Sequence, residues 1–262
     1  MKQEYVTTLN VLMAANSLTN NANPIYGSKV EDAVYDFQFN NSQWVLSNKR
    51  PINRVSIQNK DSIIVVLESP HVEEFDSNGK GVMPLHRDSY FCNNFYRALS
   101  SSNAIGSSVS KKIQSINSCC VYLMNAIQLQ CSLGFPPKYY RDYIFLYYWE
   151  TMYKDFERRL QGLLNQNTIA IINLCTQGGH SNCNQFFNWK TQKMDYMGNK
   201  CGTRFFSRLG FNNPNKNTPK SLQSIIEASV KKVISQAQLS ILYTTGAHPS
   251  SWGRKSINSA IK

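Results

Sequence analysis

The chain is poor in acidic residues and lacks long apolar runs. Its 262 residues include 16 Asp and Glu against 28 Lys and Arg, which gives a formal net charge of +12 at pH 7. This excess of basic residues points to a polyanionic partner, with nucleic acid first and membrane headgroups second. No apolar run approaches the roughly 20 residues of a membrane span, and the first residues do not resemble a signal peptide. We therefore expect a soluble, cytoplasmic protein that does not enter a membrane.

The seven cysteines include no C-x-x-C pair, which argues against the common zinc and redox motifs. Cys119 and Cys120 are neighbours, an arrangement that rarely supports an ordinary disulfide, so a reducing cytoplasm is the simplest compartment. A Cys3His zinc site is conceivable, although its spacing matches no established ligand pattern. Its members would be Cys175, His180, Cys183 and Cys201. We predict that the protein uses no metal ion and no other cofactor.

No Pro/Gly/Ser-rich linker divides the chain, so we predict a single domain over residues 1–262. Residues 1–60 are expected to form an N-terminal helical cap of that domain, with a helix at 5–18 and a short strand at 43–46. From residue 61 onward, apolar β-rich runs alternate with segments that suit helices. The expected strands are 62–67, 119–123, 168–174 and 239–245, and the expected helices are 90–99, 140–164 and 221–236. This alternation predicts an α/β fold with three layers, α/β/α, around a central, mostly parallel sheet of four strands.

The residues that follow each expected strand are the candidates for a site, because ligands of such sheets bind beyond the carboxyl ends of the strands. The first strand is followed by the acidic segment 68–74 and the second by Asn125. The third leads into a glycine-rich turn at 177–179, where backbone N–H groups could approach a phosphate. The fourth leads into a loop around His248. We expect these four segments to converge on one edge of the sheet.

Three of these segments resemble motifs of the uracil-DNA glycosylase superfamily. Members of that superfamily carry a proline-containing loop after the first core strand, an Asn after another strand, and a terminal His-Pro-Ser loop. The matching segments here, in the same order, are Glu68-Ser69-Pro70-His71, Leu123-Met124-Asn125-Ala126 and His248-Pro249-Ser250. The resemblance covers about residues 60–255. It implies a DNA glycosylase, which flips a pyrimidine base out of DNA and hydrolyses its N-glycosidic bond.

The resemblance implies three catalytic residues. His248 would donate to the departing base and stabilise its negative charge. Asn125 would read the pairing edge of the flipped base through a carboxamide that both donates and accepts. Glu68 would position water or stabilise the sugar cation. Because no lysine stands at the three motif ends, we expect a monofunctional enzyme that leaves an abasic site without a lyase step.

The expected base pocket combines the first motif with a stacking side chain. It would include Ser69, Pro70 and His71, with Phe91 as the stacking aromatic and residues 83–85 as the alternative. Ser69 and His71 stand where the best-known uracil enzymes carry an Asp and a Tyr. A changed residue near the base's 5-position is compatible with modified cytosines, such as the hydroxymethylated and glucosylated cytosines of some phage genomes, as well as with uracil. DNA repair and antiviral defence both stay open as settings.

The C-terminal loop would supply most of the DNA contacts. Trp252, four residues after His248, occupies the position of an apolar wedge that fills the gap left by a flipped base. Phosphate contacts would be sequence-independent and sensitive to salt. The residues expected to make them are Gln177, Gly178, Ser250, Ser251, Arg254 and Lys255. We expect a monomer whose partner is DNA.

The same residues also suit structural roles. Glu68 could cap a helix or form a surface ion pair, and Asn125 could close a turn. The aromatic residues of 139–149 suggest a stacking surface, but their helical spacing favours the core. Two other classes of protein stay open. One is a catalytically silent nucleic-acid-binding member of the same fold, and the other is a metal-dependent nuclease.

Overall fold

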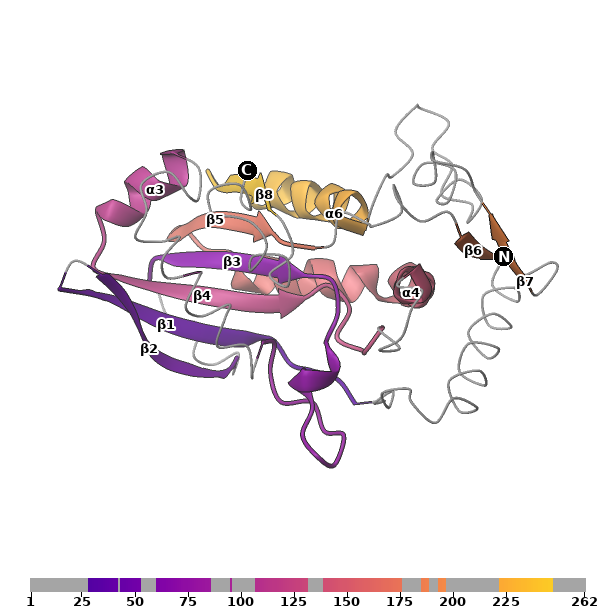
Figure 1. Cartoon of the computed structure of the whole chain (residues 1–262). Coiled ribbons are helices and arrows are strands. Elements are labelled where there is room, and N and C mark those ends of the chain that lie inside the picture. Colours follow the sequence, from indigo (N-terminus) through magenta and orange to yellow (C-terminus); the bar gives the residue numbers. More distant parts are fainter. Residues whose placement is uncertain are drawn as a thin grey trace.

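The computed structural model describes residues 28–41, 43–52, 60–85, 95, 107–131, 139–175, 185–188, 193–196 and 222–246. These residues build one large sheet with helices packed against it (Figure 1). The strands are β1 (Ala33–Asn40), β2 (Gln43–Pro51), β3 (Ser62–Leu67), β4 (Ser118–Asn125), β5 (Thr168–Asn173), β6 (Gln185–Asn188), β7 (Lys193–Tyr196) and β8 (Leu242–Thr245). The helices are the 3-10 turn η2 (Val72–Glu74), α3 (Ser107–Gln114), α4 (Tyr139–Leu163) and α6 (Leu222–Ala237). None of these helices is long and apolar enough to span a membrane.

Six strands form a mixed sheet in the order β2-β1-β4-β3-β5-β8. β4, β3, β5 and β8 pair in parallel, and they correspond to the four strands expected from the sequence. β1 pairs antiparallel with β4, and β2 pairs antiparallel with β1. The α/β class is therefore confirmed. The prediction of a four-stranded sheet is wrong, because two antiparallel strands extend the sheet beyond β4. β6 and β7 form a separate antiparallel pair.

Residues 33–51 form strands where the sequence suggested part of a helical cap. The two strands β1 and β2 are joined by a tight turn in which Asn41 has a positive φ of 48°. The first part of β1 is almost wholly buried, whereas most of β2 is exposed. Neither strand therefore shows the regular alternation that identifies a half-buried strand in a sequence. The short strand expected at 43–46 is confirmed as part of β2. The helical-cap assignment is wrong for the rest of residues 33–51, and the helix expected at 5–18 lies outside the described residues.

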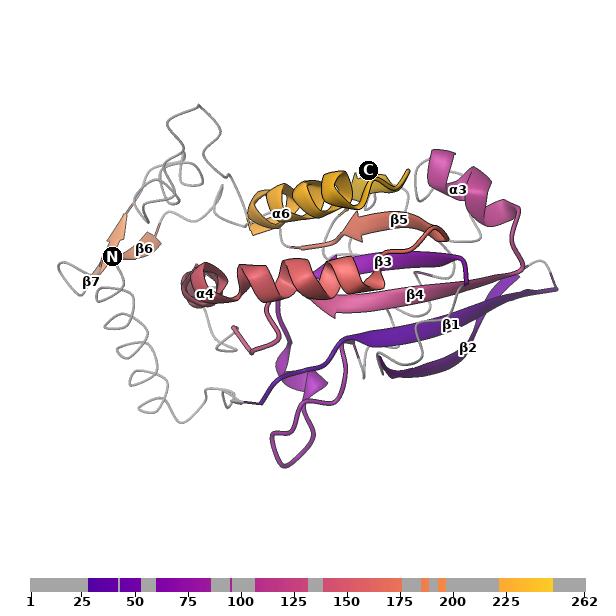
Figure 2. The ribbon, with the colours of Figure 1, turned by 180° about the vertical axis from the view of Figure 1, so that it is seen from behind.

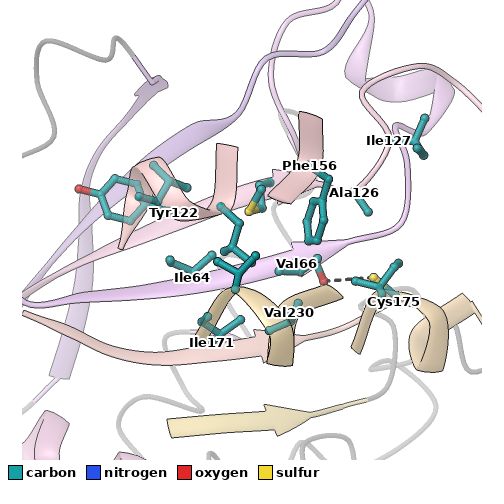
Figure 3. Packing of buried hydrophobic residues seen from close by; sticks show 14 of the residues in the cluster. Ile64, Val66, Tyr122, Ala126, Ile127, Phe156, Ile171, Cys175 and Val230 are labelled. Atoms are coloured by element: carbon teal, nitrogen blue, oxygen red, sulfur yellow. Dashed lines mark hydrogen bonds between the residues drawn. The ribbon is translucent and has the colours of Figure 1, made fainter. Parts of the chain in front are cut away.

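Both faces of the sheet are covered, because side chains at alternate strand positions divide into two buried clusters. α4 and α6 cover one face, and both lie in front of the sheet in Figure 2. Phe156 of α4 and Val230 of α6 share a cluster there with Val66 of β3 (Figure 3). The opposite face packs against α3 through Val109 and Ile113.

α4 places the aromatic side chains of Phe145, Trp149 and Phe156 in the core. The rings of Phe145 and Trp149 stack with centroids 5.6 Å apart and an interplanar angle of 17°. The Trp149 ring also contacts that of Phe156, at 5.5 Å between centroids. All three side chains are buried. For Phe145 and Trp149, the core interpretation of the 139–149 aromatic series is confirmed.

Candidate functional site

The carboxyl ends of β4, β3, β5 and β8 lie side by side at one edge of the sheet. Backbone hydrogen bonds between neighbouring segments continue just past the ends of the strands. Ala126 N donates to Leu67 O at 2.7 Å, and Gly246 N donates to Asn173 O at 3.0 Å. The segments after these four strands therefore leave the sheet at the same edge, which is where ligands bind in parallel α/β sheets.

The strand order sets the spacing between the predicted catalytic segments. β4 and β3 are neighbours, whereas β8 is two strands from β3 and three from β4. At the usual separation of about 4.8 Å per strand, the chain leaves β8 roughly 10 Å from the end of β3 and roughly 14 Å from the end of β4. Gly246, just after β8, is the last described residue before the His248 loop. The position of His248 itself lies outside the described residues, and its role stays a prediction.

Glu68 follows β3 directly and is 3% exposed. Its carbonyl oxygen accepts a hydrogen bond from Ile127 N at 3.0 Å, which holds the first predicted motif beside the second. In the same motif Pro70 is buried, Ser69 is partly buried and His71 is exposed. The structure thus brings the backbones of the two motifs together, as their positions after neighbouring parallel strands require.

His71 caps the short helix η2. Its carbonyl oxygen accepts from Glu74 N at 2.9 Å, and its Nδ1 lies 3.4 Å from Glu73 N. Its predicted place beside the 5-position of a base stays a prediction. Of the two candidates for the stacking side chain, Phe91 lies outside the described residues. In the alternative segment 83–85, Met83 is buried in the core cluster on the α3 side of the sheet and Leu85 packs against that cluster.

Asn125 is the last residue of β4 and is fully buried. It stands opposite Leu67 of β3 and continues the row of Val121 and Leu123, which faces the α3 side of the sheet. Its Nδ2 donates to Glu74 Oε2 at 3.1 Å. Within the described part of the chain, its Oδ1 has no hydrogen-bond partner. The sequence placed Glu74 in the acidic segment 68–74 but gave no reason to select it over its neighbours.

Arg159 of α4 binds backbone carbonyl oxygens at the end of β4. Its Nη2 donates to the carbonyl oxygens of Asn125 at 2.9 Å and Ala126 at 3.2 Å. Its Nη1 binds both carboxylate oxygens of Asp32, at 2.7 and 2.8 Å. Burial opposes ionisation of Asp155, but hydrogen bonds from arginines, including one from Arg159 Nε at 2.9 Å, outweigh it and lower its pKa. The guanidinium therefore ties α4 and the start of β1 to the backbone of Asn125.

Gln223 of α6 plays a similar part at the ends of β5 and β8. Its Nε2 lies 2.8 Å from Gly246 O, 3.1 Å from Asn173 O and 3.2 Å from Cys175 O. Asn173 Nδ2 in turn donates to Gln223 O at 3.0 Å and to the Tyr243 hydroxyl at 3.1 Å. Burial raises the pKa of Tyr243, so its hydroxyl stays protonated. Sequence analysis missed this network, because its side-chain members Gln223, Asn173 and Tyr243 lie in none of the predicted motifs.

Cys175 packs as a buried thiol at the end of β5. Its Sγ lies 3.6 Å from Val66 O (Figure 3). His180, Cys183 and Cys201, the other members of the hypothetical zinc site, lie outside the described residues. Among the residues that the structure does describe, no group of three or more side chains could hold a metal ion.

The predicted DNA-contact residues all lie outside the described ranges. They are Gln177, Gly178, Ser250, Ser251, Trp252, Arg254 and Lys255. The turn at 177–179 begins just after Cys175, and the 250–255 segment begins four residues after Gly246. Both parent strands, β5 and β8, end at the edge described above.

No family model, curated protein sequence or solved structure matches the chain. The resemblance to uracil-DNA glycosylases therefore depends on the three short motifs and on their order along the chain.

Proposed function

We propose that this protein is a monofunctional DNA glycosylase of the uracil-DNA glycosylase superfamily. The observation that carries the proposal is the placement of Glu68 and Asn125. Both are buried at the carboxyl ends of neighbouring parallel strands, with a backbone hydrogen bond of 3.0 Å from Ile127 N to Glu68 O between their segments. The carboxamide of Asn125 also has an Oδ1 without a partner among the described residues. A buried acceptor of this kind suits the recognition of a ligand.

The proposed reaction is hydrolysis of the bond between the base and C1′ of the sugar. The base departs with the bonding electron pair, and His248 donates a hydrogen bond to the oxygen on which negative charge develops. Glu68 stabilises the positive charge on the sugar and orients the water whose oxygen bonds to C1′. The proton of that water is released, and the product is an abasic site. Asn125 holds the flipped base through its pairing edge.

The net charge of +12 supports a nucleic-acid partner. In this proposal Arg254, Lys255 and Ser250 bind phosphates near the flipped base, and Trp252 fills the space that the base leaves in the stack. The finer features of the proposal are a single domain with α/β/α layers around the four parallel strands, a monomer in solution and a cytoplasmic location.

The proposed substrate is a pyrimidine, either uracil or a cytosine modified at its 5-position. The departures from the superfamily at Ser69 and His71 favour a base with an altered 5-position. A hydroxymethylated or glucosylated cytosine of phage DNA is the leading candidate, and it would place the enzyme in antiviral defence. Excision of uracil would place it in repair.

Base release from defined oligonucleotides tests the proposal. The purified protein is incubated with duplexes that contain uracil, 5-hydroxymethylcytosine or glucosylated 5-hydroxymethylcytosine. Mass spectrometry then identifies any free base, and alkaline cleavage detects abasic sites. We expect one of these bases to be released by the wild type and by neither Asn125→Ala nor His248→Ala, with circular dichroism to verify that both variants fold.

Two other outcomes would assign the protein to a different class. Salt-sensitive DNA binding without release of any base would indicate a silent nucleic-acid-binding protein. Strand cleavage that a chelator abolishes would indicate a metal-dependent nuclease. Either result would overturn the glycosylase proposal.

A further inference from the structure

The hydrogen bond between Asn125 and Glu74 fixes which end of the Asn125 carboxamide is available to a ligand. Both side chains are buried, at 0% and 4% exposure. The group that faces Glu74 Oε2 is the NH2 group of the amide, which donates to it. This is the arrangement that an ionised carboxylate requires, because it can only accept hydrogen bonds. Nδ2 lies 3.1 Å from Glu74 Oε2. The carbonyl end of the amide therefore points away from Glu74.

The carbonyl end is the part of Asn125 that lacks a partner. Its Oδ1 is buried and receives no hydrogen bond from any described residue. Buried carbonyl oxygens in folded proteins nearly always accept at least one hydrogen bond, and leaving one unmet is costly. A ligand that offers a donor at this point would be favoured for that reason.

Glu74 is itself held in place by backbone hydrogen bonds on both sides. Its N–H donates to His71 O at 2.9 Å, and its carbonyl oxygen accepts from Val82 N at 2.9 Å. The turn between these points is closed by Asp76, whose Oδ1 accepts from Asn78 N and Lys80 N, each at 2.9 Å. The Glu74 carboxylate therefore belongs to a loop that is held by its own hydrogen bonds. Its fixed position restricts rotation of the Asn125 amide about the bond to its side-chain carbonyl carbon.

We propose that Glu74 is a positioning residue that makes Asn125 read an N–H donor on the ligand. The inference rests on the proposed function and names its substrate class. The site would take a pyrimidine whose pairing edge carries an N–H group, either the 4-amino group of a cytosine or the N3–H of uracil. It would reject the same base once that nitrogen is alkylated, because Asn125 Oδ1 would then have no donor.

The first measurement addresses the Glu74–Asn125 bond without any need for activity. In a ¹⁵N-labelled protein, the Asn125 side-chain amide resonance is assigned by its loss in Asn125→Asp. We expect Glu74→Gln to move this resonance, because the introduced carboxamide can present either its oxygen or its nitrogen. Glu73→Gln, at the exposed neighbouring residue, is the matched control and should leave the resonance in place.

The second measurement addresses ligand selection, with free bases as probes. Uracil is compared with 3-methyluracil, and 5-hydroxymethylcytosine with its N4,N4-dimethyl analogue, by titration followed at the same resonance. We expect the wild type to bind the N–H form of at least one pair about tenfold or more tightly than the alkylated form, the scale of one lost hydrogen bond to a buried polar group. In Glu74→Gln this ratio should fall to near one, and in Glu73→Gln it should not change.

Exchanging the carboxylate of Glu74 and the carboxamide of Asn125 tests the positioning role directly. The double variant Glu74→Gln/Asn125→Asp places an amide donor at 74 and a carboxylate at 125, so one oxygen at 125 is again free to accept. Because this variant lacks the Asn125 side-chain amide, its titration is followed at the backbone N–H resonance of residue 125. We expect the double variant to recover the preference for the N–H form that Glu74→Gln loses. A purely structural role for Glu74 would not predict this recovery.

The outcomes separate this inference from the proposed function. An unmoved Asn125 resonance in Glu74→Gln would overturn the inference, as would equal or undetectable binding of both members of each pair by the wild type. A protein that prefers N–H bases but releases none from DNA would support the inference and contradict the glycosylase. A protein that releases bases regardless of alkylation would contradict the inference and support the glycosylase.

Discussion

Gln223 of α6 donates from Nε2 to the carbonyl oxygen of Gly246 at 2.8 Å. Gly246 directly follows β8 and begins the segment that leads to His248. The same Nε2 lies 3.1 Å from Asn173 O and 3.2 Å from Cys175 O at the end of β5. One buried side chain thus fixes the exits of two strands from which predicted site segments depart.

Replacing Gln223 with Leu should lower the free energy of unfolding by about 2–4 kcal/mol, because the buried carbonyl oxygens around it lose their donor. Urea denaturation followed by circular dichroism measures this change. Gln236→Leu, at an exposed position of the same helix, is the control and should change stability by less than about 0.5 kcal/mol. Equal effects of the two variants would contradict the role assigned to Gln223.

Arg159 is expected to be more important for stability than its neighbour Arg158. Their side chains are 8% and 57% exposed. Arg159→Met should cost about 3–5 kcal/mol, since it leaves the Asp32 carboxylate buried without its cation. Arg158→Met removes an exposed ion pair with Asp155 and should cost less than about 1 kcal/mol. Thermal or urea unfolding of the two variants compares them, and a cost below about 1 kcal/mol for Arg159→Met would show that the buried pair is dispensable.

The parallel strands could be predicted because a strand that is buried on both faces has a nearly continuous run of apolar residues in its sequence. β3 and β5 are buried at every position. β1 gave no comparable signal, and only residues 43–46 of β2 were predicted as a strand, since burial changes along β1 and β2 is mostly exposed. The place of β1 in the sheet depends on pairing with β4, where Cys120 lies opposite Asp36 across 84 residues of the chain, and β2 in turn pairs with β1. A local pattern does not encode that partner.

The candidate site could be predicted in part, for a related reason. Glu68 and Asn125 stand at the ends of recognisable strands, so their placement at one edge of the sheet could be predicted, whereas their catalytic roles stay predictions. Glu74 reaches Asn125 across 51 residues, and Arg159 reaches Asp32 across 127. Buried polar partners of this kind are selected by three-dimensional contacts, and nothing in the neighbouring sequence marks them.

Stability should fall at alkaline pH, because buried groups on β4 hold their protons. Burial raises the pKa of Cys120 from 9.0 to about 12, with Asp36 adding to the shift. Burial likewise raises the pKa of Tyr122 from 10.0 to about 12. Each group stabilises the fold fully below its unfolded-state pKa, and the contribution is lost as pH rises towards the folded-state value.

The urea midpoint should therefore be nearly constant from about pH 7 to pH 8.5 and fall between about pH 9 and pH 11. Cys120→Ala removes one of the titrating groups, so its midpoint should fall less steeply over the same range, whatever its stability at pH 7. A wild-type midpoint that does not change up to about pH 11 would mean that these groups ionise as readily in the folded chain as in the unfolded chain.

Replacing glycine with alanine should lower the free energy of unfolding at Gly81 and raise it at Gly162. At Gly81, which pairs with Phe75 at the base of the loop that carries Glu74, an added Cβ would lie 2.1 Å from Lys29 O and 2.7 Å from its carbonyl carbon. Backbone atoms cannot turn aside as a flexible side chain can, so Gly81→Ala should cost at least about 2 kcal/mol of unfolding free energy. At Gly162 in α4 a Cβ meets nothing within 4 Å, and Gly162→Ala should instead stabilise by about 0.5–1 kcal/mol.

Urea denaturation of the two variants gives the sign of each effect. The Asn125 side-chain amide resonance gives an independent measure at Gly81, because Val82 N donates to Glu74 O at 2.9 Å and a displaced residue 81 would shift the carboxylate that faces Asn125. We expect that resonance to move in Gly81→Ala and to stay in place in Gly162→Ala. If Gly81→Ala left both stability and the resonance unchanged, the close contact with Lys29 would not be what holds Glu74 against Asn125.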